Sequence, residues 1–317
     1  MDIIDKALGL ASQLDAIDAL RGFFIFAAST TLSISLPTSF RSRFVTYGPR
    51  ATPTSEAKPQ PSQTKSIAAR ALDSLASLRV PHSYFTQFYV ASIIYSLFWG
   101  IQLLSRGSAF QAIATRISPE HLQKTMSVNQ VMVTWVLMLI QGSRRLYECL
   151  AFSKPSSSNM WFVHWMLGAG FYVAVNVAVW IEGTETILNH KLTLDDMRMT
   201  ISPTLRTFIW VPIFLLASGL QHDCHHYLFS LEKYTLPTHP IFARIICPHY
   251  TAECAIYLSL ALIAAPKGEM VNKTLLSCLG FVVVNLGVTA ATSRQWYREK
   301  FGEEAVRGKW NMIPWVY

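Results

Sequence analysis

Seven long apolar stretches are spread over the whole length of this 317-residue chain. Each approaches the roughly 20 apolar residues that an α-helix needs to cross a bilayer. Because backbone polar groups in lipid must be satisfied within their own segment, each stretch predicts a helix. We therefore expect an all-α membrane protein, a bundle of seven transmembrane helices. The predicted spans are residues 17–36, 84–104, 126–143, 160–181, 204–222, 251–265 and 274–292.

The composition supports this class, since 51% of the residues are hydrophobic and 15% are charged. The net charge of +8 comes from Lys and Arg scattered among the loops, and not from one basic stripe, so we expect no nucleic-acid partner. These basic residues concentrate in the loops after the first, third and fifth spans and in the C-terminal tail. By the positive-inside rule, the N-terminus faces the lumen and the C-terminus faces the cytosol.

The chain divides into three predicted segments. Residues 1–40 contain the first transmembrane helix, and 41–80 form a cytosolic flexible loop that is rich in Ser, Pro and Thr at 50–66. Residues 81–317 form a membrane domain with the other six helices and the cytosolic tail. The acidic start MDIIDKALGL predicts no cleaved signal peptide. We expect five free thiols, and no glycosylation at Asn272, whose sequon lies too close to the bilayer.

A group of three histidines ends the fifth span, in QHDCHHYLFSLEKY at 221–234. His222, His225 and His226 form an HxxHH box, which is a plausible arrangement for iron or zinc. Two metals would need about eight ligands, however, and the sequence has no second box. We therefore favour a helix end that carries a water-accessible polar site, and we expect no metal.

Other polar residues accompany this box at the predicted cytosolic side. Gln221 and His225 share one helix face, and Tyr234 follows where the chain leaves the membrane. The stretch CPHYTAEC at 247–254 puts His249 and Glu253 in the first turns of the sixth span, where a helix N-terminus favours an anionic ligand. The alternative role for Glu253 is an interhelical hydrogen bond.

Two basic stretches with aromatic residues complete the set. QGSRRLYECL at 141–150 places Arg144, Arg145 and Glu148 at the end of the third span, where an ion pair and a phosphate clamp are both open. The tail at 293–317 interleaves Arg294, Tyr297 and Lys309 with other basic and aromatic groups, which suits phosphates and a nucleotide ring. Basic and aromatic residues are also normal at membrane boundaries. The chain has no GxGxxG motif, which excludes a Rossmann domain.

These pieces, in this order, resemble the steroid 5α-reductase family, and more narrowly its polyprenal reductase branch. The resemblance covers residues from about 80 to 317. It is carried by VPHSYFTQFYV before the second span, RRLYECL after the third, the Gln-x-x-Cys-His pattern ending the fifth, HYTAE, and QWYREKF with a terminal IPW.

The resemblance implies an NADPH-dependent oxidoreductase that reduces a carbon–carbon double bond conjugated to a carbonyl. Its branch implies reduction of polyprenal, or polyprenol, towards dolichal or dolichol, in support of protein N-glycosylation. It further implies a multi-pass protein of the endoplasmic reticulum membrane, surrounded by membrane lipids, which we expect to be a monomer with a polyisoprenoid lipid substrate. The residues that resemble cofactor-contacting positions or phosphate partners are Arg145, Gln221, His225, Tyr234, His249, Glu253, Arg294, Tyr297 and Lys309.

The catalytic acid departs from the family pattern. Where the steroid enzymes have a Gln–Glu pair and a Tyr, this sequence has Gln87, Phe88 and Gly142. We take Gln87 and His225 as the candidate catalytic residues. If the Gln87 amide bonds the substrate oxygen, its loss lowers kcat/KM by about 10²–10³ and leaves the Kd for NADPH nearly unchanged. The alternative is a structural bond to another helix. Other functions that stay open are a steroid or enoyl reductase, a membrane di-iron hydroxylase, and a non-catalytic lipid-binding protein.

Overall fold

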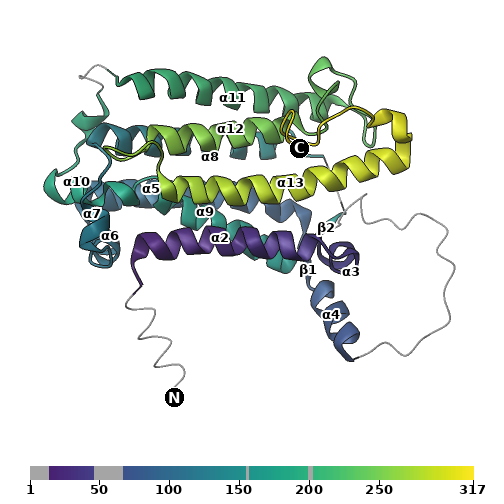
Figure 1. The fold of residues 1–317 in the computed structure, drawn as a ribbon, viewed down its shortest axis with the longest axis horizontal. Coiled ribbons are helices and arrows are strands. Elements are labelled where there is room, and N and C mark those ends of the chain that lie inside the picture. Colours follow the sequence, from purple (N-terminus) through teal and green to yellow (C-terminus); the bar gives the residue numbers. More distant parts are fainter. Residues whose placement is uncertain (1–13, 46–66, 155–156, 199–202) are drawn as a thin grey trace.

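The computed structural model describes residues 14–45, 67–154, 157–198 and 203–317, and a long helix forms at each of the seven predicted positions (Figure 1). The predicted flexible stretch 50–66 lies outside the described residues. The long helices are α2 (Ala16–Ser35), α5 (Phe85–Ser105), α8 (Val128–Ala151), α9 (Phe162–Ala178), α11 (Leu205–Ser230), α12 (Pro248–Ile263) and α13 (Lys273–Phe301).

Three of these helices extend well past the predicted spans. Hydropathy predicted ends at 143, 222 and 292, but α8, α11 and α13 continue for about two more turns each. The extra turns are polar, so a hydropathy window stops where the helix does not. The residues of the HxxHH box and of the RRLYECL stretch are consequently helical and have fixed directions.

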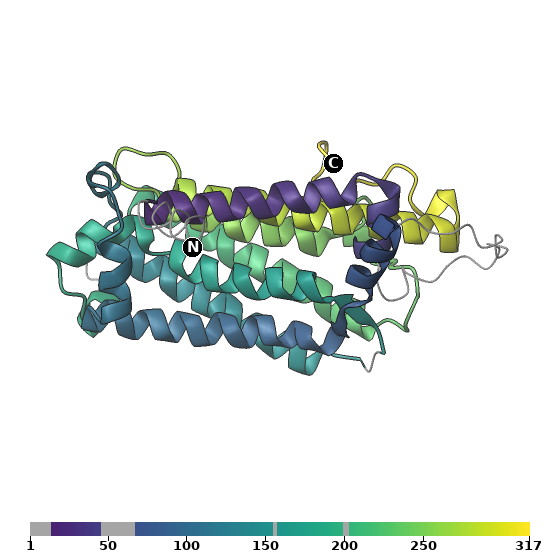
Figure 2. The same ribbon diagram turned by 90° about the horizontal axis from the view of Figure 1, so that it is seen from below.

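The long helices lie side by side along the long axis of the molecule (Figures 1 and 2). α12 packs between α11 and α13, and α2 packs against the other side of α13. α5 contacts both α8 and α9, which closes the bundle. Shorter elements connect the ends: α3 (Thr38–Phe40), α4 (Ile67–Ser77), α6 (Ser108–Ala114), α7 (Pro119–Leu122), α10 (Thr184–Asn189), and the antiparallel strands β1 (Arg79–Pro81) and β2 (Asn159–Trp161).

The surface of the bundle suits a hydrocarbon solvent. Many large apolar side chains point outward, among them Phe26 at 73% and Leu216 at 74% exposure. Four helical stretches are long and apolar enough to cross a membrane by length and composition, namely Ala16–Ser35, His82–Ser105, Phe162–Asn189 and Lys273–Phe301. The protein is therefore a multi-pass membrane protein. That all seven helices cross the bilayer is part of the proposal below.

Side-chain caps satisfy backbone groups at several helix ends. Ser127 and Gln130 form a capping box at the start of α8. The Gln130 amide also donates to the carbonyls of Ile263 and Ala265 at 2.8 and 2.7 Å, which closes the end of α12. Asn272 is fully buried and its side-chain oxygen accepts from Leu275 N at the start of α13. This burial supports the expectation that Asn272 is not glycosylated.

All five cysteines lie in the described residues and are free, which confirms the expected thiols. Four of them are buried, and Cys149 is half-buried.

A buried ion pair joins three elements at the α10 end of the bundle. Arg21 of α2 lies 2.8 Å from a carboxylate oxygen of Glu182, which is 7% exposed. The backbone and hydroxyl of Thr274, at the start of α13, donate to the same oxygen at 2.9 and 2.6 Å. These contacts place the polar groups of this end in a structural role.

Candidate active site

Glu148 is the centre of a buried charged cluster at the end of the bundle opposite α10. Its side chain is 2% exposed, and it accepts bonds from the guanidinium groups of Arg144 and Arg145 on its own helix. The Nδ1 atoms of His222 and His225, on α11, lie 2.9 and 2.7 Å from its two oxygens. A His225 tautomer with its hydrogen on Nδ1 donates this bond and leaves Nε2 as an acceptor.

Arg145 connects this cluster to the buried Tyr89 of α5, and the buried Tyr172 of α9 packs beside Tyr89. Its Nε and one terminal nitrogen donate to the Tyr89 hydroxyl at 3.2 and 3.0 Å, and its guanidinium lies 4.8 Å from the centre of the Tyr89 ring. Tyr172 of α9 packs edge-on against the Tyr89 ring, with the ring centroids 5.2 Å apart. One cation is therefore shared between a carboxylate on α8 and a phenol on α5.

An amide and carboxylate network lies beside the charged cluster. The Gln221 amide donates to Glu253 of α12, and the Gln141 amide lies 3.2 Å from the Gln221 oxygen and 3.4 Å from Glu253. Arg144 donates to the Gln141 oxygen at 2.8 Å and also to Gln221. These bonds include the interhelical contact that the sequence left open for Glu253.

His249 lies in the first turn of α12, next to His225 of α11. Their ring centroids are 5.4 Å apart, and the Tyr250 ring lies 4.2 Å from His249. The first turn of α12 presents backbone N–H groups here, with Pro248 at its first position. The structure thus brings together Arg145, Gln221, His225, His249 and Glu253, which are five of the residues that the sequence selected.

The C-terminal tail covers this helix start. Trp310 exchanges backbone bonds with residues 244 and 246 just before α12, both at 2.8 Å. Arg294 of α13 fixes the tail to this helix, because its guanidinium group donates to the backbone carbonyls of Lys309 and Val306. Partial burial lowers the pKa of Lys309.

Tyr234 and Tyr297 lie farther along this surface. Tyr234 is 51% exposed, and its backbone carbonyl accepts a bond from Lys300 at 2.9 Å. Tyr297 packs against Trp296 and Phe301 at 5.3 and 6.1 Å. These rings and basic groups form a half-exposed margin around the buried cluster.

Gln87 stands apart from the cluster. It is exposed, and its side-chain oxygen accepts a bond from Trp165 of α9 at 3.1 Å. Tyr89, two residues later, points to the opposite side of the helix and into the cluster. The structure thus shows Gln87 in a hydrogen bond to another helix, which is the alternative role that the sequence analysis left open.

The HxxHH box faces a carboxylate and two guanidinium groups. Both His222 and His225 direct Nδ1 at Glu148, and His226 is exposed with its ring 5.4 Å from Phe152. Two cationic side chains beside these rings oppose the binding of a metal cation.

We expect active protein to contain no stoichiometric iron or zinc. The imidazoles are already bonded to Glu148, and the neighbouring arginines repel a cation. Elemental analysis by mass spectrometry, together with activity after dialysis against a chelator, checks this. Stoichiometric iron, with activity that chelation removes, would contradict it.

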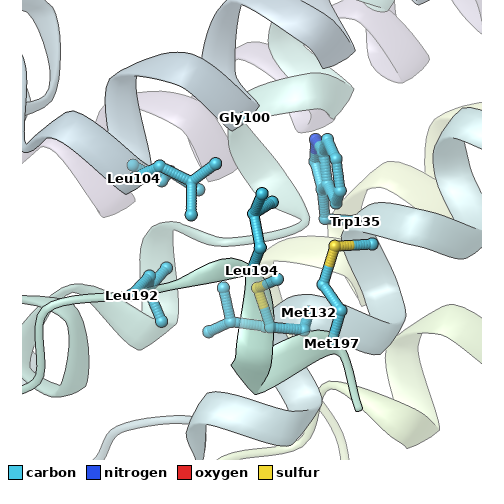
Figure 3. Close-up of a pocket in the computed structure, with 9 residues that line it drawn as sticks. Gly100, Leu104, Met132, Trp135, Leu192, Leu194 and Met197 are labelled. Atoms are coloured by element: carbon cyan, nitrogen blue, oxygen red, sulfur yellow. The ribbon is translucent and has the colours of Figure 1, made fainter.

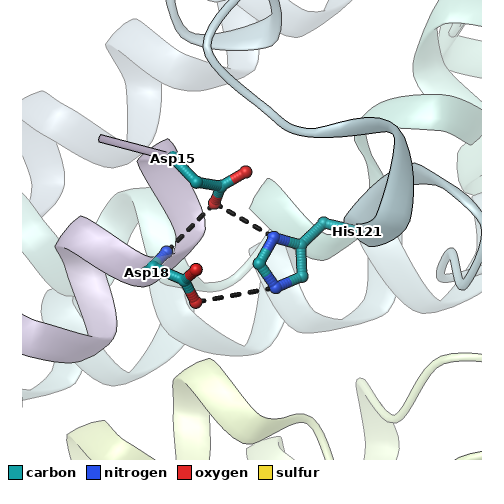
Figure 4. Close-up of side chains that lie close together, drawn as sticks. All are labelled: Asp15, Asp18 and His121. Carbon is teal, nitrogen blue, oxygen red and sulfur yellow. Dashed lines mark hydrogen bonds and ion pairs between the residues drawn. The ribbon is translucent and has the colours of Figure 1, made fainter. Parts of the chain in front are cut away.

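One group of metal-capable side chains occurs among the described residues, at the other end of the bundle (Figure 4). Asp15 caps α2 and accepts from the backbone of Ile17 and Ser118 at 2.7 and 2.6 Å. Partial burial raises the pKa of Asp15, but these bonds and the one to His121 outweigh it and lower the pKa to about 2. Arg21 lies 3.4 Å from His121, so the group is a helix cap next to a cation.

An apolar pocket also lies toward that end of the bundle (Figure 3). It is lined by Gly100 and Leu104 of α5, Met132 and Trp135 of α8, and Leu192, Leu194 and Met197 after α10. Its lining includes no titratable side chain. It therefore offers hydrocarbon contact and no acid–base chemistry.

Comparison with known proteins identifies relatives. Residues 173–317 match the family model described as 3-oxo-5-alpha-steroid 4-dehydrogenase. Polyprenal reductase 1 of Oryza sativa subsp. indica is 27% identical over 292 residues, covering 77% of this chain and 81% of that protein. Polyprenal reductase of Homo sapiens is 26% identical over 75% of this chain and 76% of its own length. The Saccharomyces cerevisiae polyprenal reductase is 30% identical over 58% and 64%.

Proposed function

Because the chain belongs to the steroid 5α-reductase family and is an oxidoreductase acting on a carbon–carbon double bond, we propose that it reduces polyprenal with NADPH. The bond reduced is the double bond of the α-isoprene unit, and the product is the dolichal precursor of dolichol. Relatives named polyprenal reductase in plants, yeast and vertebrates support this substrate.

The observation that carries the proposal is the buried polar network at one end of an otherwise apolar bundle. Arginine, glutamate, glutamine and tyrosine side chains are costly to bury in a membrane helix, and such groups mark functional sites. Here they come from α5, α8, α11 and α12 and meet within hydrogen-bond distance. A protein that only binds lipid has no need of such a network.

The residues present fit a nicotinamide cofactor. Gln221 and Glu253 offer an amide and a carboxylate that can bond the nicotinamide carboxamide. The half-exposed margin supplies the aromatic faces of Tyr234 and Tyr297, and Arg294 and Lys309 supply cations for phosphates. Arg144 Nε is buried with no acceptor among the described residues, so one charged donor remains for a ligand. NADPH, when bound, supplies a hydride. The chain's own residues orient it, and the tail over α12 shields the site from bulk solvent.

The substrate approaches from the lipid. A polyisoprenoid tail is hydrocarbon, and the exposed apolar side chains of the bundle provide a surface on which it can lie. Only its aldehyde head then needs to enter the polar cluster. In this proposal all seven helices cross the endoplasmic reticulum membrane, and the cluster and the tail face the cytosol, where NADPH is available.

A second substrate class is a 3-oxo-steroid, because the family model carries that description. The residues at the positions of the steroid enzymes' acid and phenol are Phe88 and Gly142, neither of which carries an ionisable group. This difference favours the polyprenal substrate.

The test uses purified protein in lipid nanodiscs with NADPH and, in separate reactions, polyprenal, polyprenol and testosterone. We expect NADPH oxidation with polyprenal at a rate far above that with the other two. A protein that turns over only testosterone would assign the steroid activity, and one that binds no NADPH would overturn the reductase proposal.

A further inference from the structure

The Tyr89 hydroxyl is surrounded by hydrogen-bond donors. Two nitrogens of Arg145 lie 3.2 and 3.0 Å from it and donate to its oxygen. These donors occupy its lone pairs, so its own hydrogen has to point to an acceptor elsewhere. A ligand with a carbonyl oxygen provides that acceptor.

The same surroundings stabilise the phenol after it has lost its proton. Arg145 keeps its charge at any accessible pH and lies over the ring as well as beside the oxygen. The other charged or titratable groups around this hydroxyl include Tyr172 of α9, Tyr257 and Glu253 of α12, and Cys149 of α8. Among the described residues, Arg145 is the cation that contacts this hydroxyl, so it is the positioning residue for Tyr89.

The place of Tyr89 in the fold also suits a reacting group. The residue lies in the second turn of α5, 5% exposed, at the end of the bundle where the cofactor site is proposed. One turn deeper, the fully buried Ser92 hydroxyl has no partner among the described residues and lies against Gly142 of α8. Because Gly142 has no side chain, α8 adds no polar group at this point of its contact with the face of α5 that carries Tyr89 and Ser92.

We propose that Tyr89 is the catalytic acid, which hydrogen-bonds the carbonyl oxygen of the unsaturated aldehyde and protonates it as the double bond is reduced. This assignment rests on the function proposed above. As hydride adds to the β-carbon, the double-bond electrons shift to form an enolate, and its oxygen takes the Tyr89 proton. When the enol returns to the aldehyde, the α-carbon gains a proton from water and the O–H proton goes back to Tyr89.

The first test is Tyr89→Phe, which removes only the hydroxyl. We expect kcat/KM for polyprenal to fall by about 10²–10³, the range for losing one donor to a developing oxyanion. The Kd for NADPH should stay within a factor of about two, because Tyr89 acts on the carbonyl and not on the cofactor. Tyr95→Phe, the same change on the same helix, should behave like the wild type.

The second test keeps the ring and the hydroxyl, so it does not depend on how Tyr89→Phe folds. Site-specific 3,5-difluorotyrosine at position 89 is a stronger acid than tyrosine. If the protonated phenol is the active form, the alkaline limb of the kcat/KM profile moves to lower pH, which a purely structural hydroxyl would not cause.

Three outcomes are decisive. Loss of turnover in a folded, NADPH-binding Tyr89→Phe protein, or the shifted alkaline limb, supports the assignment. Near-normal turnover in Tyr89→Phe, or an unchanged profile with difluorotyrosine, overturns it while the reductase activity stands. A wild-type protein that binds NADPH but reduces no unsaturated aldehyde refutes the proposed function itself, and the role of Tyr89 with it.

Discussion

Replacement of Glu148 by alanine should destabilise the protein by about 3–5 kcal/mol, the range for breaking a buried ion pair from one side. Glu148 is the counter-charge for Arg144 and Arg145 and the acceptor for His222 and His225. Without it, two guanidinium groups stay beside each other with no carboxylate between them. We expect a low yield of folded protein and a much lower midpoint of thermal unfolding in detergent.

Two further variants separate the charge from the shape. Glu148→Gln keeps the size and one acceptor oxygen, so we expect an intermediate loss of stability. Glu299→Gln makes the same change at an exposed residue whose side chain bonds Gln295, and it should unfold like the wild type. A Glu148→Ala protein whose stability is within about 0.5 kcal/mol of the wild type, the usual range for surface changes, would contradict the central role of this carboxylate.

Replacement of Arg294 by alanine should weaken NADPH binding by at least about tenfold, since hydrogen bonds to charged groups contribute roughly 1.5–3 kcal/mol each. Arg294 holds the tail through the carbonyls of Lys309 and Val306, so its loss releases the segment that covers α12. Glu253→Gln should weaken binding to a similar extent, because Gln221 loses its charged acceptor. Fluorescence titration with NADPH in detergent measures both Kd values.

The control for charge is Arg198→Ala. Arg198 is 78% exposed and follows α10 at the other end of the bundle, where its contact is Asp195. Its removal lowers the net charge by the same amount and should leave the Kd for NADPH unchanged. Normal affinity in both Arg294→Ala and Glu253→Gln proteins that are folded would remove the cofactor from this end of the bundle.

The helices were predictable because each carries its own signal. A stretch of apolar residues long enough for a bilayer fixes a helix by local hydrogen bonding alone, so α2, α5 and α9 begin within two residues of their predicted starts. The polar ends of α8 and α11 were not predicted, since hydropathy cannot distinguish a helix that continues into water from a loop. The pairing of α12 with both α11 and α13 depends on contacts between distant segments.

The site was predictable where charge or a polar group stood out in an apolar stretch. Arg145, Gln221, His225, His249 and Glu253 do meet, whereas Gln87 was selected for its polarity although it lies on the outer side of α5. The ion pair left open for Arg144, Arg145 and Glu148 does form. The contributions of Tyr89 and Tyr172, which lie beside it, were missed. A signal for Tyr89 does exist in the sequence.

That signal is a stripe of small and polar residues along α5. Tyr89, Ser92 and Ser96 recur at helical spacing, and all three are buried. In a membrane helix small and polar side chains mark the face that packs against other helices, so this stripe identifies the inner side of α5. Gln87 is not on it. The bond between Ser96 and Asn176 of α9 shows that the stripe is an interhelical seam.

The most direct measurement of the proposed activity follows the transferred hydrogen. Purified protein in nanodiscs is incubated with polyprenal and NADPH that carries deuterium at both positions of the reactive nicotinamide carbon, and the product is analysed by mass spectrometry and NMR. We expect one deuterium on the β-carbon of a product that is still an aldehyde. Deuterium on the aldehyde carbon, which would make the product a polyprenol with its double bond intact, would contradict reduction of the carbon–carbon bond.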